Sequence, residues 1–80
     1  MTRSRTKTMQ TDIFWARGDD GRMYLIYEVT EFRDVSDDGS MAPTWVAGGK
    51  AYHLSEGERI EQITQTDYRV AGSDLRLTRL

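Results

Sequence analysis

Short runs of aromatic and β-branched residues alternate with clusters of Gly, Asp and Ser along most of this chain. Aromatic and β-branched side chains suit the pleated, half-buried surface of a strand, whereas Gly and Asp tolerate the dihedral angles of tight turns. The pattern therefore predicts a series of short strands joined by turns. The turn clusters are Gly18–Gly21, Ser36–Ser40, Gly48-Gly49, Ser55–Gly57 and Gly72–Asp74.

The run Met23–Val35 is the most regularly patterned part of the chain. Successive side chains of a strand point to opposite faces, so the run divides into two sets. We expect the uninterrupted apolar set to face the core. Tyr24 and Ile26 make the other face apolar at the same end, which indicates a covered strand there. The run is longer than the usual strand of about 5–6 residues, so we expect a bend or bulge near Thr30-Glu31. The predicted core set is Met23, Leu25, Tyr27 and Val29.

Shorter runs predict the other strands. Asp12–Arg17 would form the first strand, before the turn at Gly18. Thr44–Ala47 and Lys50–Leu54 would be two strand pieces, and the two glycines between them mark a bulge or a second turn. Apolar residues alternate on both sides of Ala71–Asp74, which predicts a final hairpin.

The segment Glu56–Ile63 fits two structures. Ser55 followed three residues later by Glu58 is a capping box, which favours a short helix. Gly57 would fall in the first turn of that helix, so we prefer a turn followed by a strand at Arg59–Ile63. The predicted fold is therefore all-β, with about six antiparallel strands in sequential hairpins that form a small twisted barrel or sandwich. The alternative is an α+β fold with the short helix at residues 56–63.

Composition predicts one small soluble domain. Hydrophobic residues make up 38% of the 80 residues and charged residues 30%, and there is no cysteine. Residues 1–10 contain Arg3, Arg5 and Lys7 but no acid and little apolar content, so we expect a flexible basic arm before a single β domain at residues 11–80. That domain holds eight basic and thirteen acidic side chains, a net charge of −5 that makes nucleic acid an unlikely partner. No apolar run approaches the roughly 20 residues of a membrane helix, so we expect a cytoplasmic protein and no membrane partner.

The residues show no assembled catalytic or metal-binding motif. Asp34–Gly39 resembles the start of a calcium loop, but its twelfth position is Trp45 where a bidentate carboxylate is needed. His53 is the only histidine, so neither a nucleophile–base pair nor a zinc site is expected. We therefore predict a non-enzymatic protein with no cofactor.

Aromatic residues point instead to binding. Eight aromatics exceed what one face of a thin sheet can bury, so either a barrel encloses them or some form an exposed patch. We predict a module that recognises a protein partner through an aromatic-bearing sheet surface. Self-association through an edge strand is a variant of this hypothesis. The predicted partner-binding residues are Trp45, Lys50, Tyr52, His53 and Tyr24.

Two alternative functions stay open at this point. One is a small ligand-binding or enzymatic barrel that uses Glu28 with His53 or Tyr24 at the barrel mouth; half-burial would raise the pKa of Glu28. The other is a single-stranded nucleic-acid binder that combines exposed aromatics with the basic arm at residues 1–10.

About two thirds of the chain resembles a group of small, uncharacterised bacterial all-β proteins. The resemblance implies a strand after Gly57 and a bacterial source, and it implies no particular activity. It rests on Tyr24–Val35, on Trp45 with Gly48, on Lys50–Leu54, on Gly57, and on the ending Tyr68–Gly72 with Leu75–Arg79.

Overall fold

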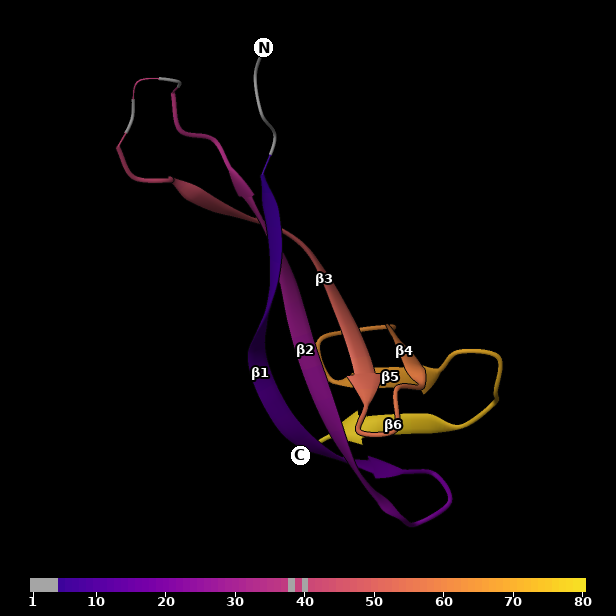
Figure 1. Cartoon of the computed structure of the whole chain (residues 1–80). Coiled ribbons are helices and arrows are strands. Elements are labelled where there is room, and N and C mark those ends of the chain that lie inside the picture. Colours follow the sequence, from indigo (N-terminus) through magenta and orange to yellow (C-terminus); the bar gives the residue numbers. More distant parts are fainter. Residues whose placement is uncertain (1–4, 38, 40) are drawn as a thin grey trace.

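The structure, a computed structural model, describes residues 5–37, 39 and 41–80. Within these residues the chain forms six antiparallel strands and no helix, and the strands close into a small barrel (Figure 1). Each strand pairs with the next along the chain, and β6 returns to β1. The prediction of an all-β fold with about six antiparallel strands is confirmed. The strands are β1 (Thr6–Gly18), β2 (Met23–Asp34), β3 (Trp45–Leu54), β4 (Arg59–Gln62), β5 (Asp67–Val70) and β6 (Arg76–Arg79).

The strands differ greatly in length, and this sets the shape of the molecule. β1, β2 and β3 have 13, 12 and 10 residues, whereas β4, β5 and β6 have four each. The short strands close the barrel at one end only, and the long strands continue past it (Figure 1). The radius of gyration is 16.2 Å, against about 12 Å for a compact chain of this length. We call the projecting part, formed by Thr6–Gln10, Thr30–Asp34 and Trp45–Gly49, the extension.

Two bulges separate the extension from the barrel. In β1 the register shifts between Gln10 and Asp12, so that Thr11 is the extra residue. In β3 the extra residues Gly48 and Gly49 lie opposite Glu31, where the β2–β3 register shifts. The predicted bulges at Thr30-Glu31 and Gly48-Gly49 are therefore one feature. Bulges bend and twist strands. The three-stranded sheet can therefore change direction here and project from the barrel.

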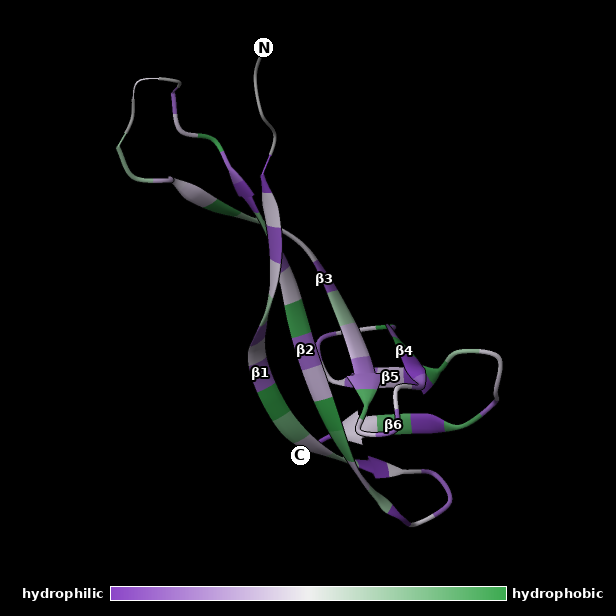
Figure 2. Ribbon diagram, viewed as in Figure 1, coloured by the Kyte–Doolittle hydropathy of each residue, from purple (hydrophilic) through white to green (hydrophobic). Residues whose placement is uncertain are grey.

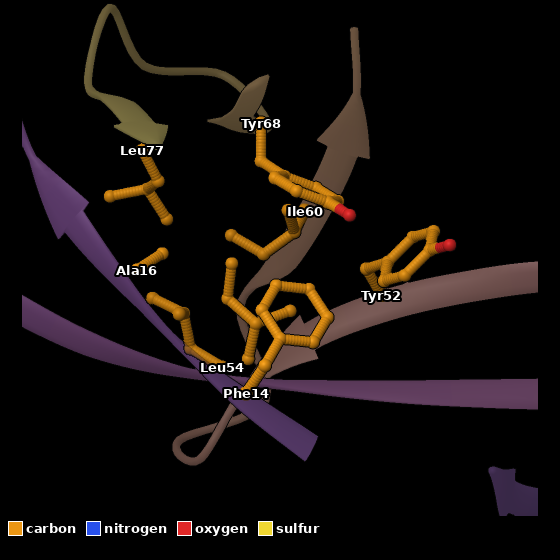
Figure 3. Close-up of a cluster of buried hydrophobic side chains, with 8 residues drawn as sticks. Phe14, Ala16, Tyr52, Leu54, Ile60, Tyr68 and Leu77 are labelled. Carbon is orange, nitrogen blue, oxygen red and sulfur yellow. The ribbon is translucent and has the colours of Figure 1, made fainter. Parts of the chain in front are cut away.

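The barrel core is made by alternate residues of all six strands (Figure 3). Phe14, Tyr52 and Tyr68 form an aromatic cluster with ring centroids 5.3–6.4 Å apart. The aliphatic side chains of Ile26 and Leu77 are fully buried beside it. Such burial contributes about 25 cal/mol per Å² of apolar surface, so this cluster is the main source of stability. The core residues are Phe14, Ala16, Ile26, Tyr52, Leu54, Ile60, Tyr68 and Leu77.

The predicted core face of β2 is wrong, although burial does alternate from one residue to the next along most of the strand. Hydrophobic and hydrophilic bands follow one another along the ribbon of β2 (Figure 2). Met23 is 44% exposed, and the other three members of the predicted core set are only half-buried. The opposite face carries the buried Ile26, Glu28 and Thr30. The cause lies in the neighbouring strands. Ile26 pairs with Phe14 on β1 and with Leu54 on β3, so these large apolar partners select the face of Ile26.

Two further predictions are settled by the strand boundaries. Arg59–Gln62 is β4 and buries Ile60, so the helix alternative at residues 56–63 is excluded and the preferred strand is confirmed. Gly57 adopts φ +94° in the turn before it, a conformation that a helix interior does not allow. β1 begins at Thr6 rather than Asp12, because residues 6–10 pair with β2. The predicted flexible arm is therefore wrong for residues 6–10, while residues 1–4 lie outside the described residues.

Candidate functional site

An apolar surface covers the outside of β1 and β2 at the barrel end. Paired residues of antiparallel strands point to the same side, and Ile13 pairs with Tyr27 while Trp15 pairs with Leu25. The most exposed of these side chains is Trp15, at 53%. We call this surface the outer patch; its members are Ile13, Trp15, Met23, Leu25 and Tyr27. Contiguous exposed apolar patches on small proteins commonly mark interaction sites.

Trp15 and Met23 lie between two depressions in this surface. The first has a volume of about 430 Å³ and is lined by Trp15, Met23 and the C-terminal Leu80. The backbone N–H of Leu80 donates to the carbonyl oxygen of Trp15, which fixes the terminus beside the indole. The second depression, of about 480 Å³, shares Trp15 and Met23 and extends to Ser55, Glu56 and Glu58 in the turn before β4. Volumes of this size can accept a large side chain of a partner.

Charged side chains line part of the second depression. Glu56, Glu58 and Arg22 all line it. Tyr24, also on its lining, donates a hydrogen bond from its hydroxyl to Asp20 at 2.5 Å. This hydrogen bond lowers the pKa of Asp20, so its carboxylate stays charged. The lining of the depression therefore combines apolar side chains with two carboxylates and one guanidinium group.

A cluster of polar and charged side chains surrounds Glu28, at the end of the barrel where the extension begins. We call it the Glu28 cluster; its members are Glu28, Thr11, Thr30, Tyr52 and Lys50. Glu28 is 8% exposed and accepts hydrogen bonds from Thr11 (Oγ1 to Oε1, 2.7 Å) and Tyr52 (OH to Oε2, 3.1 Å). Because the Thr11 hydroxyl hydrogen is used in this way, Thr30 donates to Thr11 Oγ1 at 2.7 Å. Lys50 Nζ lies 3.6 Å from Glu28 Oε1. The bulge at Thr11 explains this arrangement, because an extra residue in a strand changes the direction of its side chain, which here reaches Glu28.

The hydrogen bonds and pKa shifts of the Glu28 cluster fit a structural role better than a role in acid–base catalysis. The hydrogen bond from Thr11 is the main reason why the pKa of Glu28 is lowered, which corrects the predicted rise. Burial, followed by the hydrogen bond to Glu28, raises the pKa of Tyr52 to about 12. A group transfers protons best when its pKa is close to the working pH. The pKa values of Glu28 and Tyr52 are both shifted away from neutral pH. Among the described residues, no buried side-chain polar atom lacks a hydrogen-bond partner.

The five predicted partner-binding residues do not form one surface. Tyr52 is 8% exposed and belongs to the core, so its side chain does not contribute to an exposed surface. His53 points to the outside, where its ring stacks on Tyr27 with centroids 5.2 Å apart and an interplanar angle of 7°. Lys50 points to the same side of the sheet as Thr30, next to Glu28. Alternation along β3 therefore separates Tyr52 from His53.

The other two predicted residues lie at opposite ends of the molecule. Trp45 is at the start of β3 in the extension, half-buried under the ammonium of Lys7, which lies 4.2 Å from its ring centroid. Tyr24 is at the far end of the barrel, packed against the core and bonded to Asp20. Of the predicted residues, His53 adjoins the outer patch and Tyr24 lines its second depression.

The sequence pattern does not predict the outer patch, because it places the β2 members of this patch in the core. One signal in the sequence pointed toward it, namely that β2 is apolar on both faces near Tyr24 and Ile26. A strand that is apolar on both faces of a one-barrel protein must expose one of them or cover it with another chain. β1 is also apolar on both faces near Trp15, because Phe14 and Ala16 are buried on one face while Trp15 is exposed on the other.

The sequence matches no known family model, no curated protein and no solved structure. The resemblance to small bacterial β proteins therefore stays a prediction. Within residues 5–37, 39 and 41–80 there is no group of three or more acidic, histidine or cysteine side chains placed to hold a metal ion. The same part of the chain contains no helix that is both long and apolar enough to cross a membrane.

Proposed function

We propose that the protein is a non-catalytic binding module that recognises a protein partner through the outer patch. The observation that carries the proposal is the exposure of Trp15 between two depressions, one apolar and one that is lined in part by Glu56 and Glu58. Tryptophan is enriched among residues that dominate binding energy, because it offers a large contact area at a low entropic cost. The alternative of a Glu28-based enzyme has less support, since His53 and Tyr24 do not reach Glu28 and Tyr52 holds it instead.

The chemistry of the two depressions defines the partner. The apolar depression beside Leu80 would take a large apolar side chain, and the border formed by Glu56 and Glu58 would attract a neighbouring Lys or Arg. We therefore expect a partner segment in which an aromatic or aliphatic residue is followed closely by a basic residue. A phosphate backbone would be repelled by the same border, which disfavours single-stranded nucleic acid. The cytoplasm of a bacterium is part of this proposal, in keeping with a cysteine-free sequence.

Selection from a display library of random linear peptides tests the proposal. The immobilised protein should enrich peptides that carry a large apolar residue within a few positions of Lys or Arg. Trp15→Ala should weaken the selected peptides roughly tenfold or more, because it removes the central contact. Trp45→Ala is the matched control, since Trp45 lies in the extension, and should leave the affinity unchanged. Replacing Glu56 and Glu58 together by Gln should weaken binding and reduce its dependence on salt.

Two results would contradict the proposal. One is equal affinity of the selected peptides for the wild type and Trp15→Ala. The other is loss of the fold in Trp15→Ala, measured as the midpoint of urea unfolding, because that would make Trp15 a structural residue despite its 53% exposure.

A further inference from the structure

β1 has a long open edge in the extension. Along Thr6–Gln10 it pairs with β2 on one side, and within the described chain no strand pairs with it on the other. β6 reaches β1 only at Ala16–Gly18. An open strand edge presents unpaired N–H and C=O groups that can template pairing with another strand.

The backbone groups that point to this edge can be identified. Residues of an antiparallel strand alternate between exchanging hydrogen bonds with the partner and facing away from it. The carbonyl oxygen of Arg5 accepts from the N–H of Asp34 on β2 at 2.9 Å, so Arg5, Lys7 and Met9 face β2. Thr6, Thr8 and Gln10 therefore direct their N–H and C=O groups outward. These three residues precede the bulge at Thr11, so the edge is regular over this stretch.

The side chain that would protect this edge is drawn away from it. Natural sheets often guard open edges with lysine, whose charge prevents another strand from pairing. Lys7 is the lysine of this stretch, but its ammonium lies over the ring of Trp45 on β3, across the width of the sheet. The other open edge, at Trp45–Ala51 of β3, is interrupted by the bulge at Gly48-Gly49. A bulge of this kind blocks regular strand addition.

We propose that β1 pairs antiparallel with β1 of a second copy, centred on Thr8. In this register Thr8 faces Thr8 of the second copy, and Thr6 faces Gln10, which gives about six N–H···O=C bonds. A register centred on Lys7 would set two like charges directly opposite, and one centred on Met9 would meet the bulge and lose bonds. The pairing joins two three-stranded sheets into one continuous sheet around a twofold axis, with both outer patches on the same side. This inference does not depend on the proposed partner of the outer patch.

Disulfide trapping tests both the pairing and its register, because the sequence contains no cysteine. Across a hydrogen-bonded pair the Cα atoms are about 5.5 Å apart, which lies within the range that a disulfide spans. Thr8→Cys should therefore form a covalent dimer under mild oxidation. Thr6→Cys and Gln10→Cys alone should react at least about tenfold more slowly, since each thiol would lie roughly 14 Å from its copy. A mixture of these two variants should instead form the mixed dimer.

Amide hydrogen exchange of the wild type provides a second measurement that needs no substitution. The N–H groups of Thr6, Thr8 and Gln10 should become protected as the protein concentration rises, whereas those of Lys7 and Met9 should be protected throughout. Thr8→Pro should abolish the dimer in light scattering and keep the fold, because the outward N–H of Thr8 serves no bond to β2. Equal disulfide rates at positions 6, 8 and 10, or unprotected outward amides at every concentration, would overturn the proposal.

Discussion

The barrel and the extension share the strands β1, β2 and β3, yet they bury side chains very differently. In the barrel, Ile26 and Leu77 have no exposed surface, because β4–β6 close over the inner face of the sheet. In the extension, Met9 and Val46 are each 49% exposed. Both parts have regular antiparallel pairing. The comparison shows that strand pairing by itself does not bury side chains in this chain. A buried core forms only where the short strands β4–β6 close the barrel.

The two bulges mark the boundary between these regions. Thr11 and the glycine pair at 48–49 interrupt the ladders on both sides of β2, close to Glu28 and Thr30. The Glu28 cluster fills the barrel interior at this boundary with hydrogen-bonded polar groups. Because these groups satisfy one another, the barrel can end here without an unpaired buried charge.

The largest expected difference compares a core residue of the barrel with an aromatic of the extension. Ile26→Ala should lower the free energy of unfolding by about 2–5 kcal/mol, because it leaves a closed cavity. Phe32→Ala should cost roughly 1 kcal/mol, although phenylalanine is larger, because Phe32 is only half-buried and its site is open to water. Urea titrations of both variants measure the difference. Equal losses would mean that the extension has a core of its own.

The next effect tests the boundary. Glu28→Ala should cost about 2–3 kcal/mol, since it removes the charged acceptor of two hydrogen bonds and leaves the hydroxyl of the buried Tyr52 without this partner. Lys50→Ala is the control and should cost less than about 1 kcal/mol, because its ammonium is exposed and lies 3.6 Å from the carboxylate. The same titration distinguishes them. A cost for Lys50→Ala as large as that for Glu28→Ala would make the ion pair, rather than the hydrogen bonds, the stabilising feature.

The lowered pKa of Glu28 predicts the direction of a pH effect. The pKa is below the usual 4.5 in the folded state, so the unfolded state binds more protons between the two values. The contribution of Glu28 is therefore present above about pH 5 and is lost as the pH falls through the folded pKa. Glu28→Gln should remove this part of the acid-induced loss of stability. Glu61→Gln is the control, since it changes an exposed carboxylate paired with Arg69. This variant should lose stability in acid as the wild type does. Identical acid profiles of wild type and Glu28→Gln would refute the assignment.

A smaller effect is expected at the bulge of β3. A Cβ at Gly48 would lie 3.3 Å from the carbonyl oxygen of Glu31, whereas one at Gly49 meets nothing within 4 Å. Gly48→Ala should therefore cost about 1 kcal/mol, and Gly49→Ala should stay within about 0.5 kcal/mol of the wild type. Thermal unfolding of the two variants measures this. A larger loss of stability for Gly49→Ala than for Gly48→Ala would contradict the close approach of Gly48, rather than Gly49, to the carbonyl oxygen of Glu31.

The smallest effect concerns the contact that holds β1 to β3 in the extension. Lys7→Gln should cost about 0.5 kcal/mol, because it removes an exposed cation–π contact with Trp45. It should also change the fluorescence of Trp45, measured in a Trp15→Phe background. Arg33→Gln is the control, since Arg33 pairs with Val46 on the opposite side of the sheet and should leave the signal unchanged.

Much of the fold could be predicted from local patterns, and the candidate site could not. The turns, the final hairpin and the strand at Arg59–Gln62 follow from residue types that act over a few positions. The outer patch required knowing which side of β2 would be covered. Tyr52 and His53 are adjacent, and their opposite placements depend on the register that sets Tyr52 against Glu28. Residue type alone groups Trp45 with Tyr24, but the length of β2 and β3 places these two residues at opposite ends of the molecule.

The sequence by itself determined that β2 is extended and that its side chains fall into two alternating sets, because period-two patterning is a property of one strand. It could not determine which set is buried, because both contain large apolar residues. Only the tertiary structure decided this. The inner side is the one on which Phe14, Ile26 and Leu54 meet across three strands and β4–β6 close the barrel, so burial there depends on contacts between segments far apart in the chain.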